Sequence, residues 1–303
     1  MDSVCVIGGS RYFGRRVVER LRDEGADVTV VSRGSAPVPE GVRHVAADRD
    51  DEAGLRAALA GRSFDVVLDQ VCYTPLQAAS ARRVFAGRAG RYVMTSTAEV
   101  YDRLDGGPWA EDAVDAGAWP VRPELPWRDP GFLAAHYGEG KRQAEAVLAG
   151  RPPFEVVAVR TAHVLGGADF TGRLAHYARR MRDGVPIVVH RRPRPATFVS
   201  HAEIADVLVW AVRGSFTGPV NACSHGQADV FGLCDALAAA GAGRAVYTVG
   251  EEVSPYSFGR AYALDNGRAS GLGFRFSELG AWLPGVAAEV VAGVAEGRVA
   301  GCA

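Results

Sequence analysis

A tyrosine and a lysine four positions apart are the residues of this 303-residue chain whose types and spacing most directly suggest chemistry. Lys141 is the only lysine among 34 basic residues, the others being arginine, and Tyr137 precedes it by about one helical turn. Residues four apart on a helix share a face, which places an ammonium beside a phenol. The cation favours the phenolate and brings the pKa of the tyrosine, ordinarily about 10, closer to the range of a general acid or base. Unless the spacing is a coincidence among nine tyrosines, the pair predicts proton transfer.

A glycine-rich loop near the N-terminus has the context of a dinucleotide-binding site. An apolar run at 3–7 leads into the loop at 8–14, a helical pattern follows at 15–24, and a second apolar run occupies 27–32. Glycines permit a tight turn, and a helix N-terminus offers N–H groups and a positive dipole end to a pyrophosphate. We therefore predict that this loop binds the cofactor, the alternative being a purely structural turn. Its residues are Gly8, Gly9, Ser10, Arg11, Tyr12, Phe13 and Gly14.

The end of the second apolar run predicts which nicotinamide cofactor is preferred. An acidic residue at this place hydrogen-bonds the ribose of NAD and repels the 2′-phosphate of NADP. This chain has Ser32 and Arg33 instead, and Arg11 in the glycine loop is a second candidate for the same phosphate. We expect NADP in preference to NAD, the alternative being that these arginines are ordinary surface residues.

Apolar runs continue to alternate with helical patterns along the first half of the chain. Further strands are expected at 42–46, 64–68, 91–94 and 154–159. This order predicts an α/β fold with a Rossmann-type doubly wound parallel sheet, in which ligands collect at the carboxyl ends of the strands. The residues expected at those ends, as candidate site residues, are Asp48, Asp69, Gln70, Val71 and Thr97.

The domain organisation follows from where the alternation loosens. We expect a dinucleotide-binding domain at 1–165, with a return of the chain near 196–222, and a smaller substrate-binding lobe formed mainly by 166–303. A turn-rich segment at 106–131 holds five prolines and three tryptophans, which favours a packed lid. In the basic loop at 190–194, Arg192 and Arg194 could bind a diphosphate through bidentate hydrogen bonds. The alternative is that this loop is exposed to solvent and binds no ligand.

Composition excludes several classes of protein. A net charge near −1 and a pI of about 6.7 give no overall attraction to nucleic acid or to an anionic membrane. The five cysteines, Cys5, Cys72, Cys223, Cys234 and Cys302, have no metal-binding spacing, so we expect reduced thiols and no metal site. No signal peptide or long apolar run is present, which predicts a cytoplasmic protein that does not span a membrane.

Taken together, these motifs make the chain similar to the extended short-chain dehydrogenases/reductases, the family of NAD(P)-dependent epimerases and dehydratases of sugar nucleotides. The resemblance covers most of the chain and is strongest before residue 210. It rests on the loop at 8–14, the acid Asp48, the segment STAEVY at 96–101, and Tyr137-x-x-x-Lys141 followed by QAE at 143–145. The stretches 160–166 and 198–207 resemble later landmarks of the family.

The resemblance implies roles for individual residues. Thr97 would polarise the substrate oxygen, Tyr137 would move the proton, and Lys141 would bind the nicotinamide ribose while lowering the pKa of the tyrosine. Asp48 would face the adenine. His163 stands where many members of the family carry an asparagine that touches the sugar nucleotide, and Glu99 is a second candidate substrate contact.

Three departures from the family pattern bear on the substrate and the reaction. Arg11 replaces the middle glycine, a form that resembles an atypical branch including chloroplast stem-loop RNA-binding proteins. Ala98 replaces the acid that 4,6-dehydratases use, which makes dehydration the least favoured reaction. Ala196 stands where many sugar-nucleotide enzymes place a phosphate-binding arginine.

We therefore predict an NAD(P)-dependent enzyme that transfers hydride at a hydroxyl or keto carbon of a sugar nucleotide or similar polar ring. It would act as a ketoreductase or an epimerase on a small-molecule substrate, and a homodimer is the expected assembly. The alternative is a catalytically degenerate protein of the same fold that binds NAD(P) or RNA. The neutral overall charge disfavours the RNA reading, because an RNA binder is expected to carry a basic face with interleaved aromatic residues.

Overall fold

A computed structural model describes residues 2–104 and 106–298; Cys302 lies outside these ranges. The chain forms two compact units. Unit 1 comprises Met1–Arg103, Glu111–Thr161 and Ala205–Asn221, and unit 2 comprises Leu104–Ala110, Ala162–Ile204 and Ala222–Ala303.

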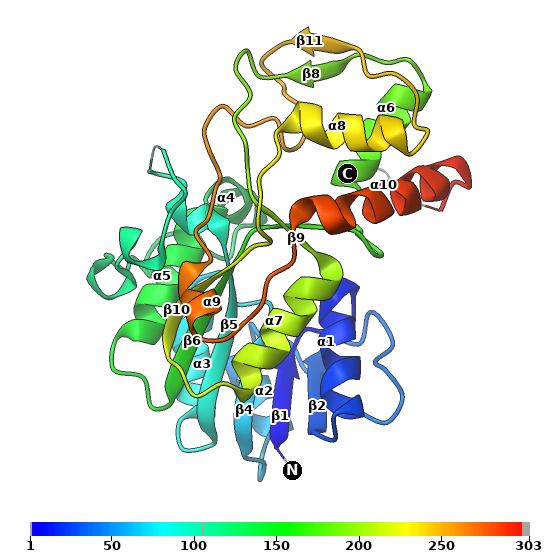
Figure 1. Ribbon diagram of the computed structural model, residues 1–303. Coiled ribbons are helices and arrows are strands. Elements are labelled where there is room, and N and C mark those ends of the chain that lie inside the picture. The colour runs from blue at the N-terminus through cyan, green and yellow to red at the C-terminus, as the bar shows by residue number, and fades with distance from the viewer. Residues whose placement is uncertain (1, 105, 299–303) are drawn as a thin grey trace. The chain divides into compact units, whose positions relative to one another are not determined.

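Unit 1 is built on a seven-stranded sheet with the order β10-β6-β5-β4-β1-β2-β3 (Figure 1). From β6 to β3, each neighbouring pair is parallel. The chain order reverses between β1 and β4, which is the point where doubly wound sheets bind ligands. The strands are β1 Ser3–Ile7, β2 Asp27–Ser32, β3 Arg43–Ala46, β4 Phe64–Asp69, β5 Ala89–Thr97, β6 Glu155–Thr161 and β10 Gly218–Ala222.

Helices cover both faces of this sheet (Figure 1). On one face, α2, α3 and α5 pack Leu55, Phe85 and Leu148 into a core with the buried strand residues. On the other, ion pairs of Arg20 with Asp206 and of Arg213 with Glu24 join α1 to α7. The helices are α1 Tyr12–Asp23, α2 Glu52–Ala58, α3 Pro75–Phe85, α4 Pro130–Ala135, α5 Tyr137–Ala149 and α7 His201–Arg213, whose first turn belongs to unit 2.

The predicted α/β fold with a Rossmann-type, mainly parallel sheet is therefore confirmed. The elements start where local chemistry allows. For example, α3 begins at Pro75, and the Thr74 hydroxyl accepts a hydrogen bond from the Gln77 N–H at 3.2 Å. The first helix begins at Tyr12, three residues earlier than the helical pattern indicated, because the glycine loop itself winds into it.

The turn-rich segment expected as one lid divides between the two units. Trp109 belongs to unit 2, where its N–H donates to the Ala263 carbonyl at 2.9 Å. The part from Glu111 onward packs on α5 in unit 1: the Trp119 indole donates to Glu139 at 3.2 Å, and the Arg122 N–H donates to Gln143 at 2.7 Å. It contains two short 3-10 helices, Glu111–Ala113 and Ala116–Ala118.

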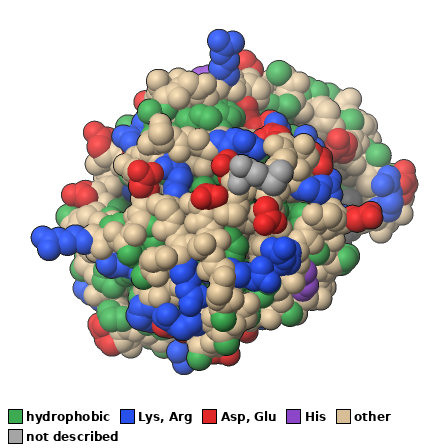
Figure 2. Space-filling view, turned by 90° about the horizontal axis from the view of Figure 1, so that it is seen from below, with side chains coloured by type: hydrophobic (Ala, Val, Ile, Leu, Met, Phe, Trp, Pro, Cys, Tyr) green, Lys and Arg blue, Asp and Glu red, His purple; other side chains and the backbone are tan. Residues whose placement is uncertain are grey.

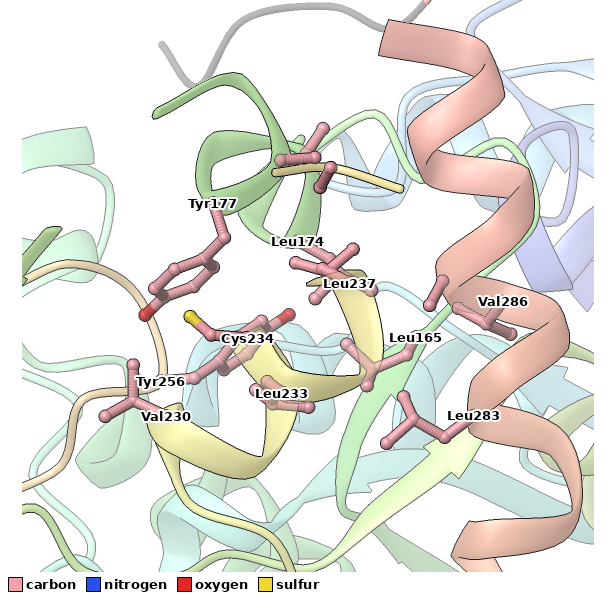
Figure 3. Packing of buried hydrophobic residues seen from close by; sticks show 14 of the residues in the cluster. Leu165, Leu174, Tyr177, Val230, Leu233, Cys234, Leu237, Tyr256, Leu283 and Val286 are labelled. Atoms are coloured by element: carbon pink, nitrogen blue, oxygen red, sulfur yellow. The ribbon is translucent and has the colours of Figure 1, made fainter. Parts of the chain in front are cut away.

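Unit 2 has little sheet and a large helical core. Two pairs of short strands, β7 His163–Leu165 with β9 Phe198–Ser200 and β8 Ile187–Val189 with β11 Tyr247–Val249, frame it. Figure 3 shows Leu174, Leu233 and Leu283 converging from α6, α8 and α10 in one apolar cluster. The helices are α6 Arg173–Arg182, α8 Val230–Ala239, α9 Gly267–Gly271 and α10 Leu279–Ala295.

Four of the five cysteines lie in the part of the chain that the structure describes. Cys5, Cys72, Cys223 and Cys234 are buried free thiols. Within the described residues no helix is long and apolar enough to cross a membrane, and no cluster of potential metal ligands is found there. On the face that Figure 2 shows, basic and acidic side chains are interspersed, so this face is not a basic nucleic-acid surface.

Candidate functional site

The glycine loop lies at the carboxyl end of β1, at the reversal point of the sheet. Gly8 and Gly9 have φ angles of +90° and +83°, a left-handed conformation that side chains other than glycine rarely adopt. The Gly8 N–H donates to the Val31 carbonyl at 2.9 Å, which ties the loop to β2. The loop then enters α1 through Arg11, whose extended backbone forms the N-cap.

The residues expected after β4 pack directly against this loop. A Cβ at Gly14 would lie 2.4 Å from the Gln70 side-chain oxygen and 2.9 Å from the Gly9 Cα, and a Cβ at Gly8 would lie 3.2 Å from Val71. The side-chain amide nitrogen of Gln70 is buried and has no hydrogen-bond partner among the described residues. A tight glycine cradle, an orphaned amide and a helix N-terminus together fit a dinucleotide.

The residues expected to discriminate between NADP and NAD lie at the end of β2. Ser32 is 2.9 Å from the ring nitrogen Nε2 of His44, on the neighbouring β3. Arg33 is exposed, and so is Arg11, whose guanidinium reaches the Ser35 carbonyl at 3.5 Å. The geometry thus leaves both guanidinium groups accessible to an anionic group at this corner of the sheet.

The two predicted acids differ in their surroundings. Asp48 is exposed, and its carboxylate accepts a hydrogen bond from the Asp50 N–H at 2.9 Å. Asp69 is fully buried and forms an ion pair with Arg49. It also accepts hydrogen bonds from the Tyr92 hydroxyl at 2.5 Å and the Val71 N–H at 2.9 Å. Asp69 lies at the end of β4, where it was predicted to be part of the cofactor site, and its carboxylate is committed to these interior contacts; its role at the cofactor stays a prediction.

Two glycines set the position of α5, the helix that carries the tyrosine and the lysine. A Cβ at Gly138 would lie 2.5 Å from the Glu99 carbonyl oxygen, and a Cβ at Gly140 would lie 2.5 Å from the Tyr73 carbonyl oxygen. The absence of side chains at these positions lets α5 approach the segments that follow β5 and β4. Tyr137, the first residue of α5, is consequently held near the carboxyl ends of these strands.

Lys141 is buried at the same edge. Its side chain is only 1% exposed, and its ammonium donates to the Thr95 carbonyl at 2.7 Å. The ammonium lies 5.8 Å from the centre of the Tyr137 ring, on the shared helix face that the spacing predicted. Burial lowers the pKa of Lys141 to about 8, so its charge is tunable in the range where an enzyme works.

Thr97 and Glu99 lie at the end of β5, next to this helix. Thr97 is the N-cap of the 3-10 helix η1 Ala98–Tyr101, and its hydroxyl oxygen accepts a hydrogen bond from the Glu99 N–H at 3.2 Å. The hydroxyl proton can still be donated to a ligand. The fully buried Arg160, on β6, forms an ion pair with Glu145, on α5, at 2.7 Å. This ion pair joins α5 to β6.

The candidate substrate residues of unit 2 have different environments. His163, on β7, stacks on Phe258 with ring centres 4.9 Å apart and is surrounded by further aromatic rings. Its ring nitrogen Nε2 is buried without a hydrogen-bond partner among the described residues. Burial lowers the pKa of His163 to about 3, so the imidazole is neutral. Arg192 and Arg194 are exposed, and the backbone N–H of Arg194 donates to the Phe258 carbonyl at 2.8 Å.

Sequence reasoning missed several residues that these contacts bring together. Arg49 is one of many arginines in the sequence, and His44 lies inside a predicted strand, so neither residue stood out as a candidate. The aromatic residues around His163 come from distant parts of unit 2 and share no local pattern. They are Phe198, Tyr256, Phe258 and Tyr262. Tyr73, which contacts both Lys141 and Tyr137, also carried no signal of its own.

Residues 4–85, which contain the glycine loop and Gln70, match the sequence model of the NAD dependent epimerase/dehydratase family. A 2′-dehydrokanamycin reductase of Streptomyces kanamyceticus is 36% identical over 96 residues. That match spans 31% of this chain and 27% of the length of the reductase.

Solved structures share the fold over nearly the whole chain. A UDP-glucose 4-epimerase of Thermotoga maritima, solved with UDP-glucose, has a TM-score of 0.74 at 17% identity, covering 95% of this chain and 97% of its own. The enzyme WbmG of Bordetella bronchiseptica, solved with NAD, has a TM-score of 0.75 at 16% identity, covering 98% and 96%. At this identity the similarity establishes the fold.

The Rossmann-type fold, with the glycine loop at the reversal point of the sheet, is the fold of the solved sugar-nucleotide epimerase that the chain resembles. Over residues 4–85, the sequence is similar to the NAD dependent epimerase/dehydratase family. The resemblance predicted from the motifs agrees with this match, and the proteins that the chain resembles are named as a reductase and an epimerase.

Proposed function

We propose that the chain reduces a keto group on a polar, hydroxylated ring, with NADP(H) as its preferred cofactor. The observation that carries this proposal is the buried Lys141 ammonium beside Tyr137, on a helix held at the carboxyl edge of the sheet. A protein that only binds a nucleotide or RNA has no need of a charge buried next to a phenol. The epimerase alternative uses the same groups and differs in whether the cofactor is consumed.

In the proposed mechanism a bound cofactor would supply the hydride. Side chains of unit 1 would donate the proton and stabilise the charges that develop. Tyr137 donates its hydroxyl proton to the carbonyl oxygen as the carbon receives hydride. Thr97 donates a hydrogen bond to the same oxygen and so stabilises the developing negative charge. Lys141 stabilises the resulting phenolate through its positive charge, and water restores the proton to Tyr137 after the product leaves.

The preference for NADP rests on charge. Arg11 and Arg33 are exposed at the end of β2, and Ser32 stands there in place of an acid. The two guanidinium groups could bind a 2′-phosphate. No carboxylate among these three residues would repel it. NAD, which the related structures from Thermus thermophilus and Bordetella bronchiseptica contain, is the alternative cofactor.

We propose that unit 2, the expected substrate lobe, recognises the substrate. His163 offers a neutral ring with an unused nitrogen, suited to a hydroxyl group. The reductase from Streptomyces kanamyceticus, named for a dehydrokanamycin, supports a keto sugar as substrate. Arg192 and Arg194 are exposed and would serve a sugar nucleotide, which the epimerase from Thermotoga maritima contains. A homodimer and a cytoplasmic location are further proposals, for which the sequence is the support.

The test is to follow reduced-nicotinamide absorbance with the purified protein and a panel of keto sugars, keto amino sugars and keto sugar nucleotides. We expect net oxidation of NADPH, and Tyr137→Phe should lower kcat by about 10²-fold to 10⁴-fold without loss of cofactor affinity, because only proton transfer is removed. Interconversion of two sugars with no net change in the cofactor would replace the reductase by the epimerase. Salt-dependent RNA binding without any turnover would overturn the enzyme proposal.

A further inference from the structure

Tyr73, in the segment between β4 and α3, covers the ammonium of Lys141. The centre of its ring lies 4.5 Å from the lysine Nζ, closer than the 5.8 Å to the Tyr137 ring. The two tyrosine rings are 6.1 Å apart with an angle of 48° between their planes. The ammonium is thus in contact with two aromatic rings, within the range of a cation–π interaction.

The backbone of Tyr73 is held firmly on both sides. Its N–H donates to the Gln77 side chain at 2.6 Å, which ties it to α3. Its carbonyl oxygen occupies the space that a Cβ at Gly140 would need, at 2.5 Å, which ties it to α5. The ring is therefore built into the same packing that places Tyr137 and Lys141.

The ammonium has few other means of support. It makes one hydrogen bond, to the Thr95 carbonyl, and in the ranges 2–104 and 106–298 no carboxylate forms an ion pair with it. Cys72, Asp69 and Glu145 favour its charged form electrostatically, and Arg49 opposes it. Burial of an ammonium without a paired carboxylate disfavours the charge, so the face of an aromatic ring matters more here than at a surface.

We propose that Tyr73 is a positioning residue whose ring face stabilises the buried Lys141 ammonium and keeps it beside Tyr137. Its catalytic consequence rests on the proposed function, in which the lysine must be charged when Tyr137 releases its proton. The interaction itself does not depend on turnover. Tyr73 would act through Lys141 and need not touch substrate.

The experiment uses the fact that Lys141 is the only lysine in the chain. Full-length protein with a lysine-free purification tag, grown with lysine labelled at the ε-carbon, gives one side-chain resonance in an NMR titration. Burial lowers the pKa of Lys141 to about 8. Tyr73→Phe keeps the ring face and should leave this pKa unchanged, whereas Tyr73→Leu keeps the burial but removes the ring, and should lower the pKa by about one unit.

Two further variants guard the interpretation. Tyr73→Met replaces Tyr73→Leu if the latter does not fold, because it fills the space without a branched or aromatic side chain. Phe64→Leu removes a buried ring at the opposite end of β4, and should cost stability without moving the lysine pKa. An unchanged pKa in Tyr73→Leu and Tyr73→Met, or an equal shift in Tyr73→Phe, would overturn the proposal.

Turnover then provides a second readout. With an active substrate, the alkaline limb of the kcat profile should move to lower pH in Tyr73→Leu by the same interval as the NMR pKa, and should return to the wild-type position in Tyr73→Phe. A purely structural role would lower kcat at every pH without moving the limb. If no substrate is turned over, the proposed function fails, while the NMR titration still decides the role of Tyr73.

Discussion

A buried arginine of unit 1 and a buried histidine of unit 2 are stabilised in opposite ways. In unit 1, the fully buried Arg160 donates to Glu145, to the Tyr101 hydroxyl at 2.9 Å and to two backbone carbonyls. In unit 2, the ring nitrogen Nε2 of His163 lies among aromatic rings without a partner in the described residues. Arg160 keeps its charge because it is paired, whereas burial keeps His163 neutral.

The difference shows which buried group is structural and which is available. A paired ion in a low-dielectric interior holds elements together, and removing one partner leaves an uncompensated charge. An unpaired polar atom in the interior costs free energy unless a ligand or water completes it. We therefore propose that Arg160 and Glu145 support α5 and that His163 takes part in recognition.

The largest effect is expected from breaking the buried pair. Glu145→Gln leaves the Arg160 guanidinium buried opposite a neutral amide, and should lower the free energy of unfolding by about 3–5 kcal/mol. Glu52→Gln, which weakens the exposed pair with Arg83, should cost less than about 1 kcal/mol. Urea unfolding of both variants measures the difference, and equal losses would mean that burial does not distinguish the two pairs.

The second expected effect is a pH dependence of the free energy of unfolding that arises from the neutral His163. Burial lowers the pKa of His163 to about 3, and in the unfolded chain it titrates near about 6.5. The unfolded state therefore takes up a proton first, and stability present above pH 6.5 is lost as the pH falls below it. Between pH 7 and pH 5 the wild type should lose about 2 kcal/mol more than His163→Phe. Parallel stability profiles for the two proteins would show that His163 accepts a proton without cost.

A third test concerns the glycine loop, where packing leaves no room. Gly14→Ala forces a Cβ against the Gly9 backbone at 2.9 Å, and should lower NADP(H) affinity by at least about tenfold. Gly285→Ala, in the middle of α10 with open space around it, should leave affinity unchanged and slightly stabilise the helix. Fluorescence titration of bound NADPH measures the affinities, and wild-type binding by Gly14→Ala would remove the loop from the proposed site.

The smallest effect is expected at the exposed arginines. Arg33→Ala should reduce the ratio of NADP to NAD affinity by about threefold to fivefold, because a solvated guanidinium contributes little to each contact. Arg43→Ala, an exposed arginine on β3, is the control and should leave the ratio unchanged. Calorimetric titration with each cofactor measures the ratio. If Arg33→Ala behaves like Arg43→Ala, the proposed NADP preference loses its main support.

The sequence by itself determined the features that depend on residues close together along the chain. The β-α-β unit around the glycine loop follows from the alternation of apolar runs, turn residues and helical patterns over 3–32. The shared face of Tyr137 and Lys141 follows from the periodicity of a helix. Such features depend on short-range sterics and hydrogen bonding, and they were predictable for that reason.

The tertiary structure alone decided which side chains are buried and what they meet. Asp69 was predicted at the carboxyl end of a strand, but only the structure shows that its carboxylate is fully buried against Arg49 and Tyr92. Tyr73 covers Lys141 only because Gly140 lets α5 approach the segment after β4. These contacts join residues far apart in the chain, and their energies depend on the local dielectric and on packing geometry, which no local pattern encodes.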